Sequence, residues 1–408
     1  MTTAFLPEAP WRHRPGFDAL CAQLGADNGV VRLVGGAVRD GMLGIDVSDI
    51  DLATRLLPEE VTERLTAAGI KVVPTGIAHG TVTAIIHHRP VEITTLRRDV
   101  STDGRRATIV YTGDWREDAA RRDFTINALY ADPATGAVYD YFGGLDDLAG
   151  GRVRFIGDPR QRIAEDHLRI LRFFRFLARF GRLPPDADGF SACVDMANSL
   201  MALSRERVAD EMMKLLALPD PAEVVRLMIE GGILAPVLPE IRMDGLDRLR
   251  ALLQQEASAG ISGASPLLRL AALLPPDAAI GDMVASRLKL SNKARKRIAA
   301  ALTRPLPHKG PLELAYRAGK ETAIDQILLG QAPGGADAVR AVERWPMPEF
   351  PVGGRDLIEL GVDPGPPIAR LLSLIREDWI AEGFPDRDRA LALAADYASQ
   401  FRRESQQS

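Results

Sequence analysis

Residues 31–54 read VRLVGGAVRDGMLGIDVSDIDLAT, and this stretch decides the fold of the N-terminal region. An apolar run ends at Gly35-Gly36, a short helical pattern follows, and a second apolar run contains Asp49 and Asp51. Side chains at positions i and i+2 of a strand share a face, so the two carboxylates should lie together. Carboxylate oxygens suit Mg²⁺, and a glycine pair at a helix start lets backbone N–H groups approach phosphate oxygens. The stretch therefore predicts a divalent metal beside a triphosphate, which is what nucleotidyl transfer requires.

The composition is that of an ordinary globular protein of 408 residues, long enough for several domains. The net charge of −4 does not indicate a nucleic-acid partner, so that partner has to be argued from local charge. Only Cys21 and Cys193 are present, which excludes a disulfide scaffold and a cysteine-rich zinc site. No apolar run approaches 18 residues, and the N-terminus lacks the apolar core of a signal peptide. We therefore expect a cytoplasmic protein with no membrane contact. The sequence does not indicate its oligomeric state.

The chain changes character near residue 150. Before this point, alternation and turn residues predict strands at 29–34, 48–53, 70–73, 81–87, 91–96 and 137–141. Helical patterns are expected at 16–24, 36–43, 58–68 and 117–129. Residues 97–116 lack clear periodicity at first and carry four arginines before position 107, which predicts a long functional loop. From about residue 159 onward the pattern is helical almost throughout.

A second motif, RRDFTINAL, occupies residues 121–129. Two arginines at a helix start can bind phosphate oxygens by forked hydrogen bonds, and Asp123 can accept from a ribose hydroxyl. An exposed helix cap with ion pairs is the alternative for such residues. Glu92 lies on a later predicted strand, where it is either a third carboxylate beside Asp49 and Asp51 or the partner of a neighbouring arginine.

A third motif lies in residues 157–181, where Pro159 predicts a helix start and Gly181 its end. On this helix Arg172, Arg175 and Arg179 share one face, and Asp166 and Arg169 lie one turn apart beside them. Ile170, Phe173, Phe174 and Leu177 form another face and should be core. Residues 150–182 contain nine arginines against three acidic residues, a local basic surface suited to triphosphate and RNA.

Asp166 and Arg169 together can select a nucleobase. Cytosine and adenine both present an amino donor next to a ring-nitrogen acceptor, so Asp166 can accept from the former while Arg169 donates to the latter. Uracil and guanine reverse both groups and would leave mismatched polar contacts. The alternative is a surface ion pair between positions i and i+3, on a solvated helix face.

Taken in order, these motifs resemble the nucleotidyltransferase superfamily of DNA polymerase β-like enzymes. Within it they resemble the class II tRNA nucleotidyltransferases (CCA-adding enzymes) and the bacterial poly(A) polymerases. The resemblance is at residue level from about 29 to 217, and it includes LSRERVADE at 203–211. Residues 97–116 occupy the place of that family's flexible loop. Beyond residue 218 only a general helical character is shared.

The resemblance implies an α+β fold, with a polymerase β-like nucleotidyltransferase head and a mixed sheet, followed by an all-helical neck, body and tail. We expect the head at 1–150, the neck with the base-recognition helix at 151–217, and a tRNA-binding body and tail at 218–408. The implied activity is template-independent addition of C and A, from CTP and ATP, to the 3′ end of tRNA. A poly(A) polymerase, an enzyme that adds only A, and a non-catalytic RNA-binding protein remain as alternatives.

The same resemblance assigns roles to individual residues. Asp49 and Asp51 would hold two Mg²⁺ ions, with Glu92 as a further catalytic carboxylate. ATP or CTP would be bound by Gly36, Arg39, Arg122, Asp123, Asp166, Arg169, Arg172 and Arg175, of which Asp166 and Arg169 would select the base.

Overall fold

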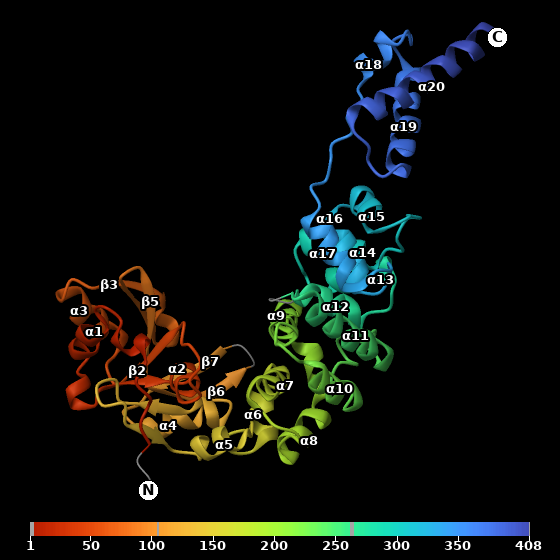
Figure 1. The fold of residues 1–408 in the computed structure, drawn as a ribbon. Coiled ribbons are helices and arrows are strands. Elements are labelled where there is room, and N and C mark those ends of the chain that lie inside the picture. The colour runs from red at the N-terminus through yellow and green to blue at the C-terminus, as the bar shows by residue number, and fades with distance from the viewer. Residues whose placement is uncertain (1–3, 104–105, 262–264, 408) are drawn as a thin grey trace. The chain divides into compact units, whose positions relative to one another are not determined.

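The computed structural model describes residues 4–103, 106–261 and 265–407. Its N-terminal region contains a seven-stranded mixed sheet in the order β3-β4-β5-β2-β1-β8-β9 (Figure 1). These strands are β1 (Val31–Val34), β2 (Ile50–Thr54), β3 (Lys71–Gly76), β4 (Thr81–Ile86), β5 (Arg89–Thr95), β8 (Leu129–Ala131) and β9 (Val138–Asp140). Neighbouring strands are antiparallel except β2 and β5, which run parallel. The predicted α+β class with a mixed sheet is confirmed.

Short helices surround this sheet and connect its strands. The α-helices of the head are α1 (Phe17–Gln23), α2 (Gly36–Met42), α3 (Pro58–Ala67), α4 (Trp115–Ala120) and α5 (Gly144–Gly150). The 3₁₀ helices are η1 (Pro10–His13), η2 (Ala26–Asn28), η3 (Ile77–His79) and η4 (Thr125–Asn127). One core cluster joins β1, β2 and β8 to α4 through the buried side chains of Val34, Ala53, Trp115 and Tyr130. This packing fixes the ends of β1 and β2, where the predicted site residues begin.

Two expectations for the head are wrong. Residues 97–116 do not form a long loop, because β6 (Arg97–Asp103) and β7 (Arg106–Tyr111) pair as a separate two-stranded sheet and α4 follows. The helix expected at 117–129 ends at Ala120, and the chain then passes through η4 into β8. All three residues of β8 are buried, so the strand lacks the alternation that marks a half-exposed strand.

The neck is helical, but the single helix expected between Pro159 and Gly181 is wrong. Its helices are α6 (Pro159–Glu165), α7 (Arg169–Phe180), α8 (Ala187–Asp195), η5 (Ala197–Ala202) and α9 (Arg205–Leu216), and α10 (Ala222–Glu230) follows it. Between α6 and α7, Asp166 has an extended backbone with φ −151° and ψ 106°. Its carboxylate accepts the N–H of Leu168, a local bond that competes with helix continuation. The apolar face predicted for α7 is buried, as expected.

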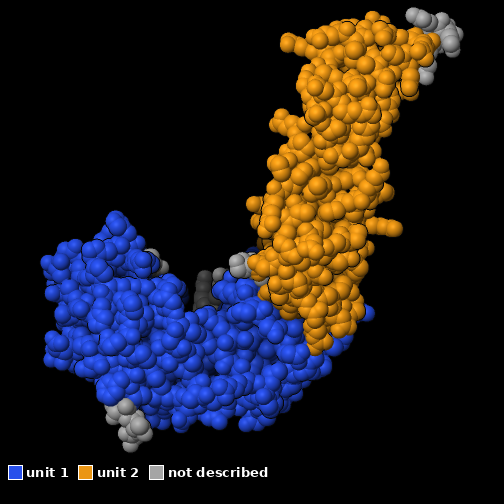
Figure 2. All heavy atoms as spheres, viewed as in Figure 1, with its two compact units in different colours: residues 1–243 blue, residues 244–408 orange. Residues whose placement is uncertain are grey.

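The contacts divide the chain into two compact units, Met1–Met243 and Asp244–Ser408 (Figure 2). The first unit contains the head, the neck and also α10. The helices of the remainder are α11 (Met243–Ala259), α12 (Pro266–Leu273), α13 (Ala278–Arg287), α14 (Asn292–Leu302), α15 (Pro311–Ala318), α16 (Lys320–Leu328), α17 (Gly335–Arg344), α18 (Gly354–Glu359), α19 (Pro366–Ala381) and α20 (Arg387–Gln407). Near the C-terminus, Leu357, Ile375 and Trp379 centre a separate hydrophobic cluster.

None of the helices in the described part of the chain has the length and apolar character that a membrane crossing requires.

Candidate active site

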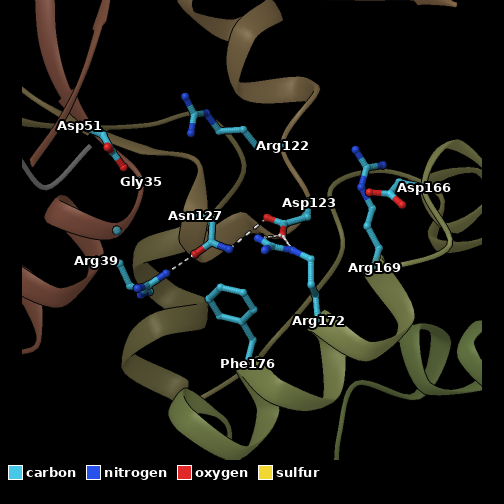
Figure 3. Close-up of a pocket in the computed structure, with 11 residues that line it drawn as sticks. Gly35, Arg39, Asp51, Arg122, Asp123, Asn127, Asp166, Arg169, Arg172 and Phe176 are labelled. Atoms are coloured by element: carbon cyan, nitrogen blue, oxygen red, sulfur yellow. Dashed lines mark hydrogen bonds and ion pairs between the residues drawn. The ribbon is translucent and has the colours of Figure 1, made fainter. Parts of the chain in front are cut away.

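A cavity of about 350 Å³ lies within the first unit, where the head meets the neck (Figure 3). This volume is within the range of small-ligand pockets. Its lining comes from the start of α2, from β2, from the RRDFTINAL motif, and from the α6–α7 connection with α7. The lining residues are Gly35, Gly36, Arg39, Asp51, Arg122, Asp123, Asn127, Asp166, Arg169, Arg172 and Phe176. Eight of the eleven predicted site residues therefore line one pocket, and Asp49, Glu92 and Arg175 lie outside this set.

Gly35 and Arg39 form the side of the pocket where α2 begins. Gly35 has φ +65°, and a Cβ at this position would lie 3.4 Å from the Arg122 guanidinium. Arg39 is buried, and it donates to the side-chain oxygen of Asn127 at 2.5 Å and to Asp40 at 2.7 Å. The glycine thus allows α2 to approach an arginine closely, and Asn127 is a lining residue that the sequence reasoning did not single out.

The carboxylates at the β2 end of the pocket are crowded by like charge. Asp51 on β2 is paired in register with Glu92 on the parallel strand β5. Burial raises the pKa of Asp51 to about 6, and Glu92 and Asp49 act in the same direction while Arg122 opposes them. Among the described residues, no group of three histidine, cysteine or acidic side chains is arranged as a metal site. Two neighbouring carboxylates, of which Asp51 has a raised pKa, nevertheless fit a divalent cation that also takes phosphate oxygens.

Asp49 differs from Asp51 in its surroundings. β2 begins at Ile50, so Asp49 stands one residue before the strand and is exposed. Its carboxylate accepts the hydroxyl of Ser48 at 3.2 Å. The two aspartates are therefore neighbours, but only Asp51 is held by the sheet.

Arg122 is held in place by a buried carboxylate that sequence reasoning missed. Asp118 on α4 accepts from Arg121 at 2.8 Å, from Arg122 at 3.1 Å and from the Tyr130 hydroxyl at 2.6 Å. Burial alone would raise the pKa of Asp118, but the two arginines and the tyrosine lower it to about 2. The spacing of Asp118 to Arg121 and Arg122 is i,i+3 and i,i+4, which is a recognisable signal for such a contact on a helix.

Asp123 and Arg172 are bound to each other rather than open to solvent. Arg172 donates to one Asp123 oxygen through two nitrogens, at 2.8 and 2.6 Å. The other Asp123 oxygen accepts from Asn127 and from the main chain of Phe124. Burial raises the pKa of Asp123, but Arg172 and Asn127 lower it overall. This pair, in which Asp123 is buried and Arg172 partly exposed, connects the head motif to α7 across 49 residues of sequence (Figure 3).

Arg175 is not among the lining residues, although its guanidinium lies over the ring of Phe176, which is one of them. Its Nε donates at 2.6 Å to Glu211, a buried carboxylate on α9. The contact of Arg175 with a nucleotide stays a prediction.

Asp166 and Arg169 lie beside each other on the neck side of the pocket (Figure 3), but each pairs with a different residue. Asp166 accepts from Arg207 of α9 at 2.8 Å. Arg169 donates to Glu165 at 2.6 Å and to the carbonyl of Arg162 at 2.8 Å. Both side chains are only partly buried, so each keeps a polar edge toward the cavity. Arg207 and Glu165 are further residues of this site that the sequence reasoning did not assign.

Two family models match the chain. The Poly A polymerase head domain matches residues 31–154, and the probable RNA and SrmB-binding site of polymerase A matches residues 185–244. Among similar proteins, the mitochondrial CCA tRNA nucleotidyltransferase 1 of Mus musculus is 34% identical over 93% of this chain and 89% of its own length. The CCA-adding enzyme of Levilactobacillus brevis is 32% identical over 88% of this chain and 92% of its own.

Solved structures show the same similarity. The CCA-adding enzyme of Bacillus stearothermophilus in complex with CTP has a TM-score of 0.72 and 27% identity, over 96% of this chain and all of the other. The Thermotoga maritima CCA-adding enzyme complexed with tRNA has a TM-score of 0.71 at 19% identity, over 97% of this chain and 98% of the other, which supports the fold alone.

Proposed function

The chain belongs to the family of CCA-adding tRNA nucleotidyltransferases, and for that reason we propose that it adds C and A, from CTP and ATP, to the 3′ end of tRNA. The observation that carries this proposal is the single pocket that holds Asp51 on its head side and Asp166 with Arg169 on its neck side (Figure 3). Chemistry and base recognition then act on one nucleotide without a nucleic-acid template.

The family uses divalent metal, and Mg²⁺ is the ion that we propose here. Asp49 and Asp51 would hold it, and Glu92, in register with Asp51, would add a third negative charge. When bound, Mg²⁺ would neutralise the triphosphate and make the terminal ribose hydroxyl of tRNA a better nucleophile. The raised pKa of Asp51 supports this assignment, because a bound cation would offset both the burial and the like charge of Glu92 that raise it.

The arginines bind and orient the nucleotide in this proposal. Arg122, held by Asp118, and Arg39, held by Asn127, present fixed guanidinium groups to phosphate, beside the backbone of Gly36. Arg172 and Asp123 would meet the sugar as a pair, since each is already bound to the other. Arg175 would also bind the nucleotide, although it is not one of the residues that line the pocket.

Asp166 and Arg169 would select the base. The Asp166 carboxylate, which accepts from Arg207, is an acceptor suited to the amino group of C or A. Glu165 holds Arg169 by one nitrogen, which leaves other N–H groups for the adjacent ring nitrogen. Uracil or guanine would face these groups with the opposite pattern.

We propose further that residues 1–150 act as catalytic head, 151–217 as base-reading neck and 218–408 as tRNA-binding body and tail. A cytoplasmic location is part of the same proposal.

One experiment tests the function. Purified protein is given tRNA that lacks one, two or three terminal nucleotides, with labelled CTP or ATP, and product lengths are measured. A CCA-adding enzyme completes each substrate and stops. An A-adding enzyme extends only tRNA ending in CC, a poly(A) polymerase makes long A tails, and a non-catalytic RNA-binding protein adds nothing.

A further inference from the structure

The segment that carries Asp49 into the site is held less by the sheet than Asp51 is. β2 pairs with β5 from Ile50 onward, so Asp49 lies outside the hydrogen-bonded register. The residues before it, 43–46 and 48, are exposed, and Val47 is the buried one among them. The position of Asp49 therefore depends on what holds residues 47 and 48.

Arg14 holds these two residues from the N-terminal segment. Its guanidinium donates to the carbonyl of Val47 at 2.6 Å and to that of Ser48 at 3.1 Å. The two bonds span 33 and 34 residues of sequence and end on the two residues immediately before Asp49. An arginine bound to two successive carbonyls fixes both the place and the direction of the chain that follows.

The base of Arg14 is itself anchored. Leu6 and Trp11 pack so closely on α2 that a Cβ at Gly41 would lie 2.9 Å from Leu6 and 3.1 Å from Trp11. Three residues after Arg14, the side chain of Phe17 is fully buried. The chain from Leu6 to Phe17, which carries Arg14, is thus held in place by packing against the head.

The side-chain packing behind the start of β2 is incomplete, so the position of residues 47–49 depends more strongly on Arg14. A cavity of about 270 Å³ lies there, lined among others by Arg14, Phe17, Ile50 and Val91. Ile50 and Val91 face this cavity, whereas their neighbour Asp51 lines the nucleotide pocket on the other face of the sheet. Beside the buried side chain of Val47, the hydrogen bonds of Arg14 are therefore a main support of the chain at residues 47–49.

We propose that Arg14 is a positioning residue for Asp49. It keeps the backbone at residues 47 and 48 where the Asp49 carboxylate can share a cation with Asp51. The inference rests on the proposed role of Asp49 as a metal ligand. Loss of the two bonds would weaken metal binding while leaving base selection, on the neck side of the pocket, unchanged.

The test compares full-length Arg14→Gln and Arg14→Lys with wild type. Arg55→Gln is the matched control, because Arg55 also donates to a main-chain carbonyl of the head, that of Gly113 at 2.9 Å. Binding of Mn²⁺, used as the probe in the presence of CTP, is measured by electron paramagnetic resonance. The Mg²⁺ concentration for half-maximal CMP incorporation, the CTP:UTP ratio and the melting temperature are measured alongside.

We expect Arg14→Gln to weaken Mn²⁺ binding and to raise the half-maximal Mg²⁺ concentration by roughly 10-fold, as for other residues that orient metal ligands. Arg14→Lys should recover part of this loss, since lysine keeps the charge but reaches fewer acceptors in a fixed geometry. The CTP:UTP ratio should not change, and Arg55→Gln should bind Mn²⁺ as wild type does.

Wild-type Mn²⁺ affinity in Arg14→Gln would overturn the inference. An equal loss in Arg55→Gln would overturn it too, since the effect would then be general destabilisation. Asp49→Ala in the same assay separates this failure from that of the proposed function. If Asp49→Ala binds Mn²⁺ normally, the metal assignment is wrong; if it does not and Arg14→Gln does, only the role of Arg14 is wrong.

Discussion

Replacing Asp166 by asparagine should turn an unfavourable contact with uracil into a favourable hydrogen bond. The carboxylate can only accept hydrogen bonds. One of its oxygens already accepts from the Leu168 N–H, and the other accepts from Arg207. The remaining lone pairs of the carboxylate would accept a hydrogen bond from the amino group of C or A. They would repel the carbonyl oxygen of uracil. The asparagine amide offers an N–H₂ donor in nearly the same shape, so it could donate to that carbonyl.

The size of the effect follows from one polar contact. A mismatched contact of this kind costs about 1–3 kcal/mol, and each 1.4 kcal/mol is a factor of ten. The CTP:UTP preference of Asp166→Asn should therefore fall roughly 5- to 150-fold. Single-turnover incorporation of the two nucleotides into tRNA lacking its terminal CCA measures it.

Asp158→Asn is the matched control for this experiment. Asp158 also accepts a main-chain N–H at a helix start, that of Arg160 at 2.8 Å, but it lies outside the pocket lining. If both variants lose a similar small amount of stability and neither changes the CTP:UTP ratio by more than about twofold, Asp166 is only a helix cap and ion-pair partner.

Three further predictions concern the head and the division of the chain. Asp51→Ala should reduce the rate of nucleotidyl transfer to below about a tenth of wild type, because metal sites of this kind contribute several kcal/mol. Its tRNA affinity should stay within a few-fold of wild type. Rapid-quench kinetics measures the transfer rate, and filter binding measures the tRNA affinity. Apparent Mg²⁺ affinity should fall about tenfold between pH 7 and pH 5, since a pKa of Asp51 raised to about 6 lets a proton compete with the metal; calorimetry showing less than a twofold change would mean that Asp51 titrates near its usual value. The fragment Met1–Met243 should bind CTP but lose its preference for tRNA over unrelated RNA, and equal tRNA affinity of fragment and full chain in filter binding would contradict a tRNA-binding role of the remainder.

A fourth concerns stability. Asp118→Ala should destabilise the protein by about 3–5 kcal/mol in urea unfolding, because it leaves Arg121 and Arg122 without their buried partner. Unfolding close to that of wild type would show that water replaces the carboxylate.

Much of the head could be predicted from the sequence because its strands are exposed on one side or bounded by turn residues. β5 shows alternating burial from Val91 onward, and Gly35 marks the turn into α2. β8 could not be predicted in this way, since it is buried throughout and a short buried strand has the same apolar pattern as a buried helix turn. The break at Asp166 was missed because neither glycine nor proline marks it, and only the side-chain bond to Leu168 favours it.

In the site, too, features that depend on neighbouring residues could be predicted from the sequence, whereas contacts between distant residues could not. Eight of the eleven residues that line the pocket could be named from their motifs, because each motif is contiguous. Their partners could not, since Asp123 and Arg172 are 49 residues apart, and Asp166 and Arg207 are 41 apart. Arg14, which lies before the first motif, carries no local signal of its contact with residues 47 and 48.

Asp166 stands in the connection between α6 and α7, whereas Arg169 stands on α7 itself. The two members of the proposed base-reading pair therefore differ in how freely evolution can change them. A shift of Arg169 would require repacking Phe173 and Phe174, which are fully buried behind the helix. A substitution of Asp166 would change the carboxylate without replacing a buried aromatic side chain of α7. We therefore expect descendants of this protein that acquire a new nucleotide preference to vary at this turn first, while the helix and its aromatic support stay constant.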